Sequence, residues 1–167
     1  EWLAAQDVTP ARQFWKRHLN AVTTPSRVKF PAPATIGRGN GELYRLLPTH
    51  TLATLDTFGK QHGLTQATIL MGLYALVLAR ISRMDELVLG SVHNGRTVSI
   101  DGIDQAVGLF IDTLPHYMAM PSGQRLIDWL ALQQQVQAEQ DAYSHIGLLG
   151  IQAQSKIKGQ ALFEALF

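Results

Sequence analysis

The residues best suited to chemistry lie on two segments, Gly90-Ser91-Val92-His93-Asn94-Gly95-Arg96 and Val107 to Pro115. The first segment predicts a buried strand ending at Gly95-Arg96, and the second predicts a strand carrying Asp112-Thr113 in its middle. A buried, unpaired Asp112 would be unstable, so it needs a partner or a solvated cavity. Arg96 could pair with it if the strands are neighbours. A structural ion pair and a channel-lining role both remain open.

Other kinds of reactive site find little support. The chain has no cysteine, which excludes disulfides, thiolate metal sites and cysteine nucleophiles. No Gly-x-Ser-x-Gly elbow occurs. The run Gly37-Arg38-Gly39-Asn40-Gly41 neither follows a predicted strand nor opens a helix, so we interpret it as a loop and not as a phosphate cradle.

The histidines do not form a metal-binding pattern. The six are His18, His50, His62, His93, His116 and His145. None has the i, i+4 partner of a helical zinc site, so no metal is expected. His93 and His116 each lie at the end of a predicted strand, where ligands commonly meet α/β sheets, although ordinary strand-end polar residues would look the same.

Composition narrows the class of protein. The 167 residues carry 14 Lys and Arg against 13 Asp and Glu, a net charge of +1 that excludes a basic nucleic-acid-binding surface. Only 16% of residues are charged, below the roughly 25% that is typical. This raises the question of which surface does not face water. The longest apolar stretch, residues 67–81, is shorter than the ~20 residues that span a bilayer. No membrane segment is expected, and the lack of cysteine fits a cytoplasmic protein.

The elements that must position these residues alternate between helix and strand. Helices are predicted over residues 10–19, 49–62, 66–83, 124–144 and 146–154, and strands over residues 43–47, 86–92, 107–118 and 161–167. Thr9, Thr65 and Ser122 are the expected N-caps and Gly63 an expected C-cap. Helix 66–83 is apolar nearly all round, which predicts burial on most sides. The order predicts an α/β fold, a two-layer sandwich with a mixed β-sheet packed against helices.

At these two segments the chain resembles the C-terminal half of a condensation domain from a nonribosomal peptide synthetase. The family pattern is a strand ending in Gly-Arg, a spacer, and then Val-Gly-Leu-Phe-Ile-Asn-Thr-Leu-Pro, which Gly95-Arg96 and residues 107–115 match. Further similar stretches are residues 14–19, 64–81, 143–145, 151–152 and 161–167. Two departures stand out. The catalytic His-His-x-x-x-Asp-Gly motif of the family is absent, and Asp112 replaces the usual Asn, which would change the polarity of the substrate tunnel.

The resemblance implies one lobe of a chloramphenicol acetyltransferase-like fold, with residues 1–167 as the C-terminal lobe and the last strand truncated. The chain begins without Met and ends on an apolar run, so both ends look like cuts through a longer polypeptide. The implied reaction is amide formation between aminoacyl or peptidyl thioesters tethered to carrier proteins, in antibiotic or secondary-metabolite biosynthesis. This lobe would be noncatalytic alone. It would supply part of the carrier-docking surface and a tunnel wall that contains Ser91, His93, Arg96, Asp112 and Thr113.

The implied partners are the N-terminal condensation lobe, peptidyl carrier proteins and an adjacent adenylation domain. No cofactor would bind directly, because phosphopantetheine arrives on the carrier proteins. The isolated chain is expected to self-associate. Two alternatives stay open: a noncatalytic docking module from a degenerate condensation domain, and an epimerization or heterocyclization relative. The string Leu-Phe-Ile-Asp-Thr-Leu-Pro argues against the second alternative.

Overall fold

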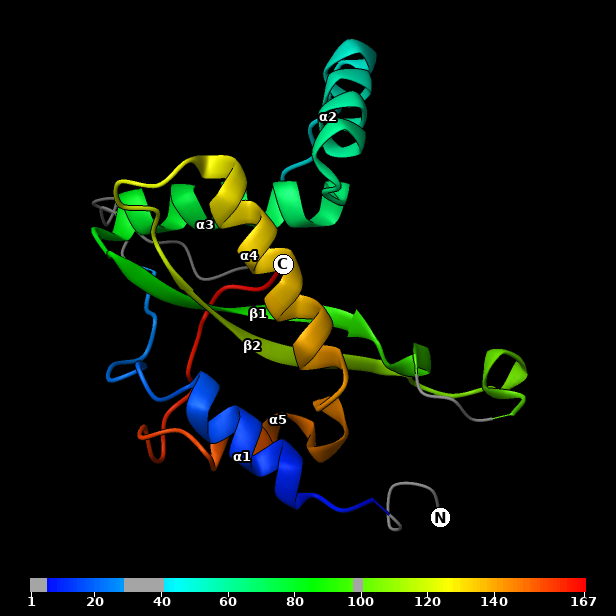
Figure 1. Ribbon diagram of the computed structural model, residues 1–167, viewed down its shortest axis with the longest axis vertical. Helices are drawn as coiled ribbons and strands as arrows, with labels where there is room; N and C mark the ends of the chain where they lie inside the picture. The colour runs from blue at the N-terminus through cyan, green and yellow to red at the C-terminus, as the bar shows by residue number, and fades with distance from the viewer. Residues whose placement is uncertain (1–5, 29–40, 98–100) are drawn as a thin grey trace.

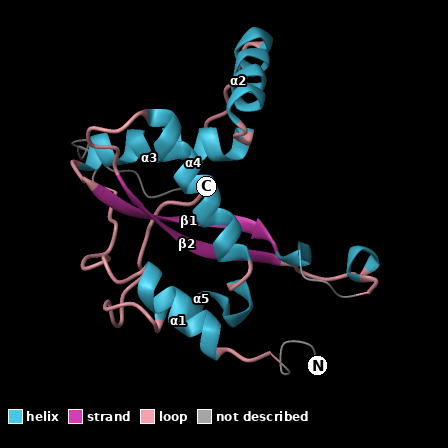
Figure 2. Cartoon of the chain, viewed as in Figure 1, coloured by secondary structure: helices cyan, strands magenta, loops and turns pink. Residues whose placement is uncertain are grey.

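The computed structural model describes residues 6–28, 41–97 and 101–167. It contains the helices α1 (Thr9–His18), α2 (Thr49–His62), α3 (Gln66–Ser82), α4 (Leu126–Asp141) and α5 (Gly147–Gln152), and the strands β1 (Glu86–Asn94) and β2 (Ile111–Ala119). Three short 3₁₀ turns, η2 (Gly95–Thr97), η3 (Ile103–Gln105) and η4 (Ser144–Ile146), lie between them. Figures 1 and 2 show α1, α3, α4 and α5 around one central sheet and α2 projecting away from it. The predicted α/β class is confirmed. Residues 37–40 of the glycine-rich run lie outside the described residues.

The sheet pairs β1 with β2 in antiparallel register, Leu87 opposite Met118 and His93 opposite Asp112. The last residues of the chain run along the other edge of β1 in parallel. Gly90 N–H donates to Ala165 O (3.0 Å), and Phe167 N–H donates to Gly90 O (2.9 Å). The predicted strand over residues 161–167 therefore forms only isolated bridges, and the sheet joins antiparallel and parallel pairing.

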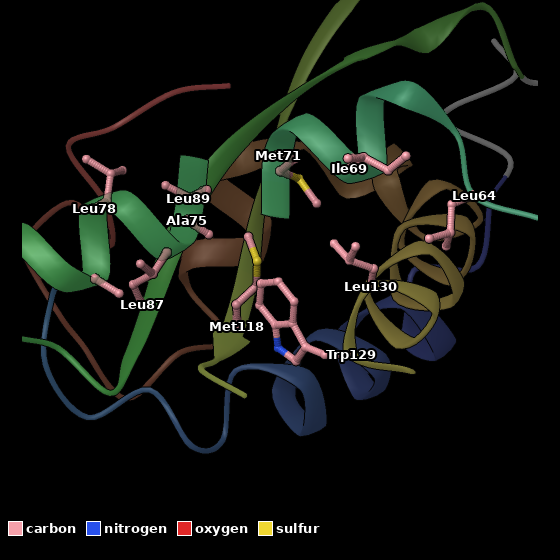
Figure 3. Close-up of a cluster of buried hydrophobic side chains, with 11 residues drawn as sticks. Leu64, Ile69, Met71, Ala75, Leu78, Leu87, Leu89, Met118, Trp129 and Leu130 are labelled. Carbon is pink, nitrogen blue, oxygen red and sulfur yellow. The ribbon is translucent and has the colours of Figure 1, made fainter. Parts of the chain in front are cut away.

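Two apolar clusters hold the layers together. Figure 3 shows the first cluster, in which Trp129 and Leu130 of α4 meet Met71 of α3 and Met118 of β2. The second surrounds Trp15 of α1 and includes Leu114 of β2 and the buried residues Leu19, Val22, Val88, Ile151, Ile157 and Leu162. Both clusters draw residues from the sheet, so helices from both ends of the chain are fixed relative to β1 and β2.

Helix ends follow the sequence signals only in part. Thr65 caps α3, its side chain accepting from Thr68 N–H, and Gly63 ends α2 with φ 65°, both as predicted. The other two caps are wrong. Thr9 is already helical, and Asp7 Oδ1 accepts its N–H at 2.9 Å. Ser122 lies before α4, whose first turn is held instead by Arg125 and Asp128 (2.8 Å).

The structure corrects one prediction about an apolar segment and refines another. Residues 43–47 form no strand, and Leu43 and Leu46 are 89% and 96% exposed, since no described strand lies beside them to complete a ladder. Helix α3 is buried on most sides, as predicted, but one side is exposed: Leu73, Val77 and Ile81, spaced by four, are 41%, 55% and 40% exposed. No single described helix is long and apolar enough to cross a membrane; α2 and α3 pass that test only together and are bent by 106°.

Candidate functional site

The end of β1 requires a glycine. Gly95 N–H donates to Phe110 O at 2.5 Å, which draws the two chain segments together where the β1–β2 ladder stops. A Cβ added to Gly95 would lie 2.7 Å from that same oxygen, closer than real Cβ contacts allow. The glycine of the Gly-Arg motif therefore permits a close approach of backbone to backbone.

Arg96 holds the loop between the strands. Its guanidinium donates to Ala106 O at 2.8 Å and to Ile103 O, and lies 3.9 Å over the centroid of the Phe110 ring. A planar guanidinium can serve two carbonyls and an aromatic face at once. The Arg96–Asp112 ion pair, one of the two alternatives that the sequence left open, does not form, because the guanidinium of Arg96 contacts the loop carbonyls and the Phe110 ring instead.

Asp112 faces His93 across the ladder. Its Oδ1 accepts from Thr113 N–H at 2.8 Å, and no described Lys or Arg pairs with it. Burial raises the pKa of the Asp112 carboxyl, while the Thr113 N–H and the charge of His93 act in the opposite direction. Asp112 is thus a half-buried carboxylate whose neighbour across the ladder is the imidazole of His93.

The main residue that sequence reasoning missed is Asp141, at the C-terminal end of α4. His93 Nδ1 lies 2.6 Å from Asp141 Oδ1, and the His93 side chain is only 15% exposed. The other ring nitrogen, His93 Nε2, is buried and has no hydrogen-bond partner among the described residues. Helical periodicity indicates which side of its helix a residue occupies, but it does not indicate where in the fold the helix ends. The sequence therefore could not predict the contact between His93 and Asp141.

The pairing register of β1 and β2 places the five predicted wall residues in three different positions. Side chains of directly opposed residues lie on the same face, and successive residues alternate. Ser91, His93 and Asp112 therefore share one face with Leu89, whereas Thr113 points to the other face. Arg96 lies beyond the ladder in η2. The structure brings three of the five together.

A second polar group, buried beneath α4, was also missed. Gln140 Nε2 donates to Pro115 O at 3.2 Å, so its Oε1 accepts from Nδ1–H of His116 at 2.8 Å. The same Gln140 amide nitrogen lies 2.9 Å from Nε2 of His18, and His116 Nε2 lies 3.0 Å from the Gln133 side chain. These contacts tie α1 and β2 to α4.

Burial decides the charge of this group. It lowers the pKa of His116, and it lowers the pKa of His18 to about 4, with the neighbouring His116 acting in the same direction. Both rings are therefore neutral at pH 7. The network has a structural role. His116, for which the sequence left open both a ligand contact and an ordinary polar role at a strand end, is wholly buried.

A hollow of about 360 Å³ opens elsewhere on the sheet, lined by Val22, Thr24, Ser26, Met84, Asp85, Glu86, Leu87, Val88 and Tyr117. Tyr117 O–H donates to Glu86 Oε2 at 2.7 Å, and burial together with this contact raises the pKa of Tyr117 to about 12. None of the five predicted wall residues lines the hollow. Within the described ranges, no group of His, Cys, Asp or Glu side chains could hold a metal ion.

The sequence model of the condensation domain matches residues 1–167, the whole chain. The chain belongs to the condensation-domain family. A linear gramicidin synthase of Brevibacillus parabrevis is 34% identical over 170 residues, which cover 99% of the chain and 3% of that protein. Bacitracin synthase 1 of Bacillus licheniformis is 32% identical, over 97% of the chain and 3% of that protein. The chain thus spans a few per cent of the length of these curated relatives.

Solved structures support the fold of this condensation-family chain. The X-domain from teicoplanin biosynthesis aligns with a TM-score of 0.80 at 17% identity, over 97% of this chain and 37% of that one. A four-domain nonribosomal peptide synthetase bound to AMP and glycine aligns with a TM-score of 0.78 at 18% identity, over 96% of this chain and 12% of that one. The expected chloramphenicol acetyltransferase-like fold is confirmed.

Proposed function

We propose that residues 1–167 are the C-terminal lobe of a condensation domain that forms amide bonds in a nonribosomal peptide synthetase. The observation that carries this proposal is the family match along the whole chain. The similarity to linear gramicidin and bacitracin synthases supports a role in the biosynthesis of a peptide natural product. The N-terminal lobe, carrier proteins and an adenylation domain are the proposed partners.

In the proposed reaction an acceptor amine attacks the thioester carbonyl of a donor. A C–N bond forms, the C–S bond breaks, the donor carrier leaves as its free phosphopantetheine thiol, and the amine loses a proton. The His-His-x-x-x-Asp-Gly motif, which residues 1–167 lack, would position or deprotonate the acceptor amine. The contribution of this lobe is to confine two tethered substrates, which can supply much of the rate.

Within this lobe we assign the tunnel wall to Ser91, His93 and Asp112, which share one face of the sheet. Thr113 contributes through its backbone N–H, which holds the Asp112 carboxylate. Arg96 does not line the wall itself; it holds the loop between β1 and β2 through hydrogen bonds to two of the loop carbonyls. The five residues thus have three different roles in the proposed tunnel.

The experiment measures amide formation by the complete domain between two loaded carrier proteins, with mass spectrometry of the carrier-bound product. Asp112→Asn restores the usual residue of the family pattern and should change the rate by severalfold, because it removes a carboxylate from the wall. Asp101→Asn, an exposed carboxylate in the neighbouring loop, is the matched control. Equal rates for a folded Asp112→Asn and the parent would contradict the wall assignment.

The docking-module alternative gives a different result. A degenerate domain would bind loaded carrier proteins and form no amide. Carrier binding is therefore measured beside product formation, by the change in carrier amide chemical shifts. Binding without product, in a domain whose upstream His motif is intact, would favour docking over catalysis.

A further inference from the structure

A second hollow, of about 380 Å³, opens where α3 ends beside the start of β1 (Figure 1). It is lined by the last two turns of α3, by the residues that link α3 to β1, and by Met120 after β2. The proposed wall residues Ser91, His93 and Asp112 lie toward the opposite end of the ladder and do not line it. The hollow has the size of a small-molecule site, and the proposed function does not use it.

Charged and apolar side chains both line this hollow. Arg80 and Arg83 are exposed, and neither guanidinium has a hydrogen bond or an ion pair among the described residues. Asp85 is exposed as well, and its carboxylate has no ion pair within the described ranges. Met84 and Met120 are partly buried and belong to the apolar part of the lining. The hollow therefore offers two positive charges, one negative charge and an apolar surface.

Arg83 occupies a backbone position that favours glycine. It caps the C-terminal end of α3 with φ 54°, and no other non-glycine residue in the described part of the chain has a positive φ. Helix α2 ends in the same conformation with Gly63, at φ 65°. A side chain at such a position strains the backbone, and strained residues of this kind gather at binding sites. The position of Arg83 on the hollow gives its guanidinium a use that glycine could not supply.

We propose that this hollow binds a free α-amino acid with an apolar side chain. Arg80 and Arg83 hold its α-carboxylate, because guanidinium groups form strong, charge-assisted hydrogen bonds with carboxylates. Asp85 accepts from its α-ammonium group, and the flexible side chains of Met84 and Met120 pack against its side chain. The negative charge of Asp85 also disfavours a dianion such as a phosphate ester, which would carry a second negative charge and no ammonium.

Three related probes test the assigned contacts. Binding to the complete domain is measured by saturation-transfer NMR, with leucine as the amino acid. Leucinamide lacks the carboxylate, and N-acetyl-leucine lacks the ammonium group and represents the carboxyl terminus of a peptide. We expect both to bind about tenfold more weakly than leucine, the value of one charged contact. Equal binding of leucine and N-acetyl-leucine would overturn the assignment to a free amino acid.

Variants locate the binding at this hollow. Arg83→Gly is the most informative, because glycine fits the backbone and the substitution removes only the side chain. It should weaken leucine binding about tenfold and leave the melting temperature unchanged or higher, which a purely structural role of Arg83 would not produce. Asp85→Asn should weaken the binding of leucine and leave that of N-acetyl-leucine unchanged. Arg17→Gln, at an exposed position of α1, is the control.

Two further results would overturn the inference. One is the absence of saturable leucine binding to the wild-type domain. The other is leucine binding to a folded Arg83→Gly variant with the affinity of the parent, which would place the bound amino acid elsewhere. Neither measurement involves amide formation, so failure of this inference and failure of the proposed function are distinguishable.

Discussion

Gly95 and Arg96 are adjacent but have separate roles. Gly95 lets the backbone of β1 approach Phe110, and Arg96 then binds the loop that joins the strands. The Gly-Arg pair of the family pattern is therefore explained by the geometry at the end of a strand, without any contact to substrate. Asp112, by contrast, has no Lys or Arg partner among the described residues, because Arg96 does not pair with it.

Arg96→Ala should loosen the loop while the core stays folded. The substitution removes two hydrogen bonds and the contact with Phe110, a loss of about 1–2 kcal/mol borne by residues 101–110. We expect faster limited proteolysis within that range, and no rescue by Arg96→Lys, whose ammonium cannot serve two carbonyls and a ring together. Arg12→Ala, at an exposed position of α1, is the control. A loop as resistant as the parent's would contradict the assigned role.

His18 makes stability depend on pH. Its pKa is lowered to about 4 in the folded chain against 6.5 in the unfolded one, so the unfolded state binds the proton first. Stability is therefore lost as pH falls from 6.5 toward 4, by about 2 kcal/mol between pH 7 and pH 5 from this residue. Urea unfolding at the two pH values measures the difference.

The matched variant is His18→Gln, which can still accept from Gln140 but does not titrate. The pH difference should shrink in this variant and persist in His62→Gln, on the far helix α2. Part of the difference should remain in His18→Gln, because burial also lowers the pKa of His116. An undiminished difference would show that other groups control the acid sensitivity.

The residues of the site were only partly predictable. The positions of Ser91, His93 and Asp112 on two strands were predictable, because strand positions are inferred from alternation and burial, which are local properties; the register then places the three on one face. Asp141 and the Gln140 network could not be found, since contacts between a strand and a distant helix end depend on packing. For Arg96 the sequence left open a pairing with Asp112, and it could not indicate the loop carbonyls that Arg96 actually binds, because backbone acceptors carry no signal in the side-chain sequence.

At the scale of elements, the crossing of α3 and α4 depends on one small residue. Gly72 faces α4, and a Cβ there would contact Leu130 and lie 3.0 Å from Cζ3 of Trp129. Both side chains are almost fully buried. The helices therefore approach more closely than an alanine would permit, which fixes the position of α4 over the sheet.

Gly72→Ala should destabilise the fold by about 1–3 kcal/mol, the usual effect of overpacking, even though alanine favours helix. Leu73→Ala, on the adjacent exposed position, should have a much smaller effect. Urea unfolding of both variants gives the comparison. A Gly72→Ala variant as stable as the parent would mean that the α3–α4 contact relaxes without strain.

The helices were predicted better than the strands. Their apolar spacing is repeated over several turns, so α2 and α3 were placed to within a residue. The strand predicted over residues 43–47 rested on a short local pattern, and no described strand lies beside it for pairing. The last predicted strand, residues 161–167, pairs only through bridges to the edge of β1 and to Ser26. The local sequence does not show which edge is open for pairing.

At the scale of the whole molecule, the low charge corresponds to apolar surface that this chain does not cover. Leu73, Val77 and Ile81 form an exposed stripe on α3, and Val92 and Ile111 lie exposed at the far end of the sheet. Scattered apolar residues need no explanation, but a stripe at helical spacing is typical of a contact surface. In the proposed two-lobed domain such surface would be covered.

The 167-residue chain alone should therefore self-associate as its concentration rises, as measured by static light scattering. Replacing Leu73, Val77 and Ile81 by Gln should reduce the association, because it removes most of the apolar area of the stripe. Replacing the solvent-facing Thr54, Thr57 and Gln61 of α2 by Ala is a control that leaves the stripe intact. Monomeric behaviour of the parent at high concentration would contradict the expectation.

The most direct test of the central claim is amide formation itself. The complete domain, with its N-terminal lobe, and the 167-residue chain alone are each incubated with a donor-loaded and an acceptor-loaded carrier protein, and the acceptor carrier is analysed by mass spectrometry. We predict an acceptor carrier heavier by the donor acyl group with the complete domain, and no such product with the chain alone. Product from the chain alone, or none from a folded complete domain with an intact His motif, would contradict the account.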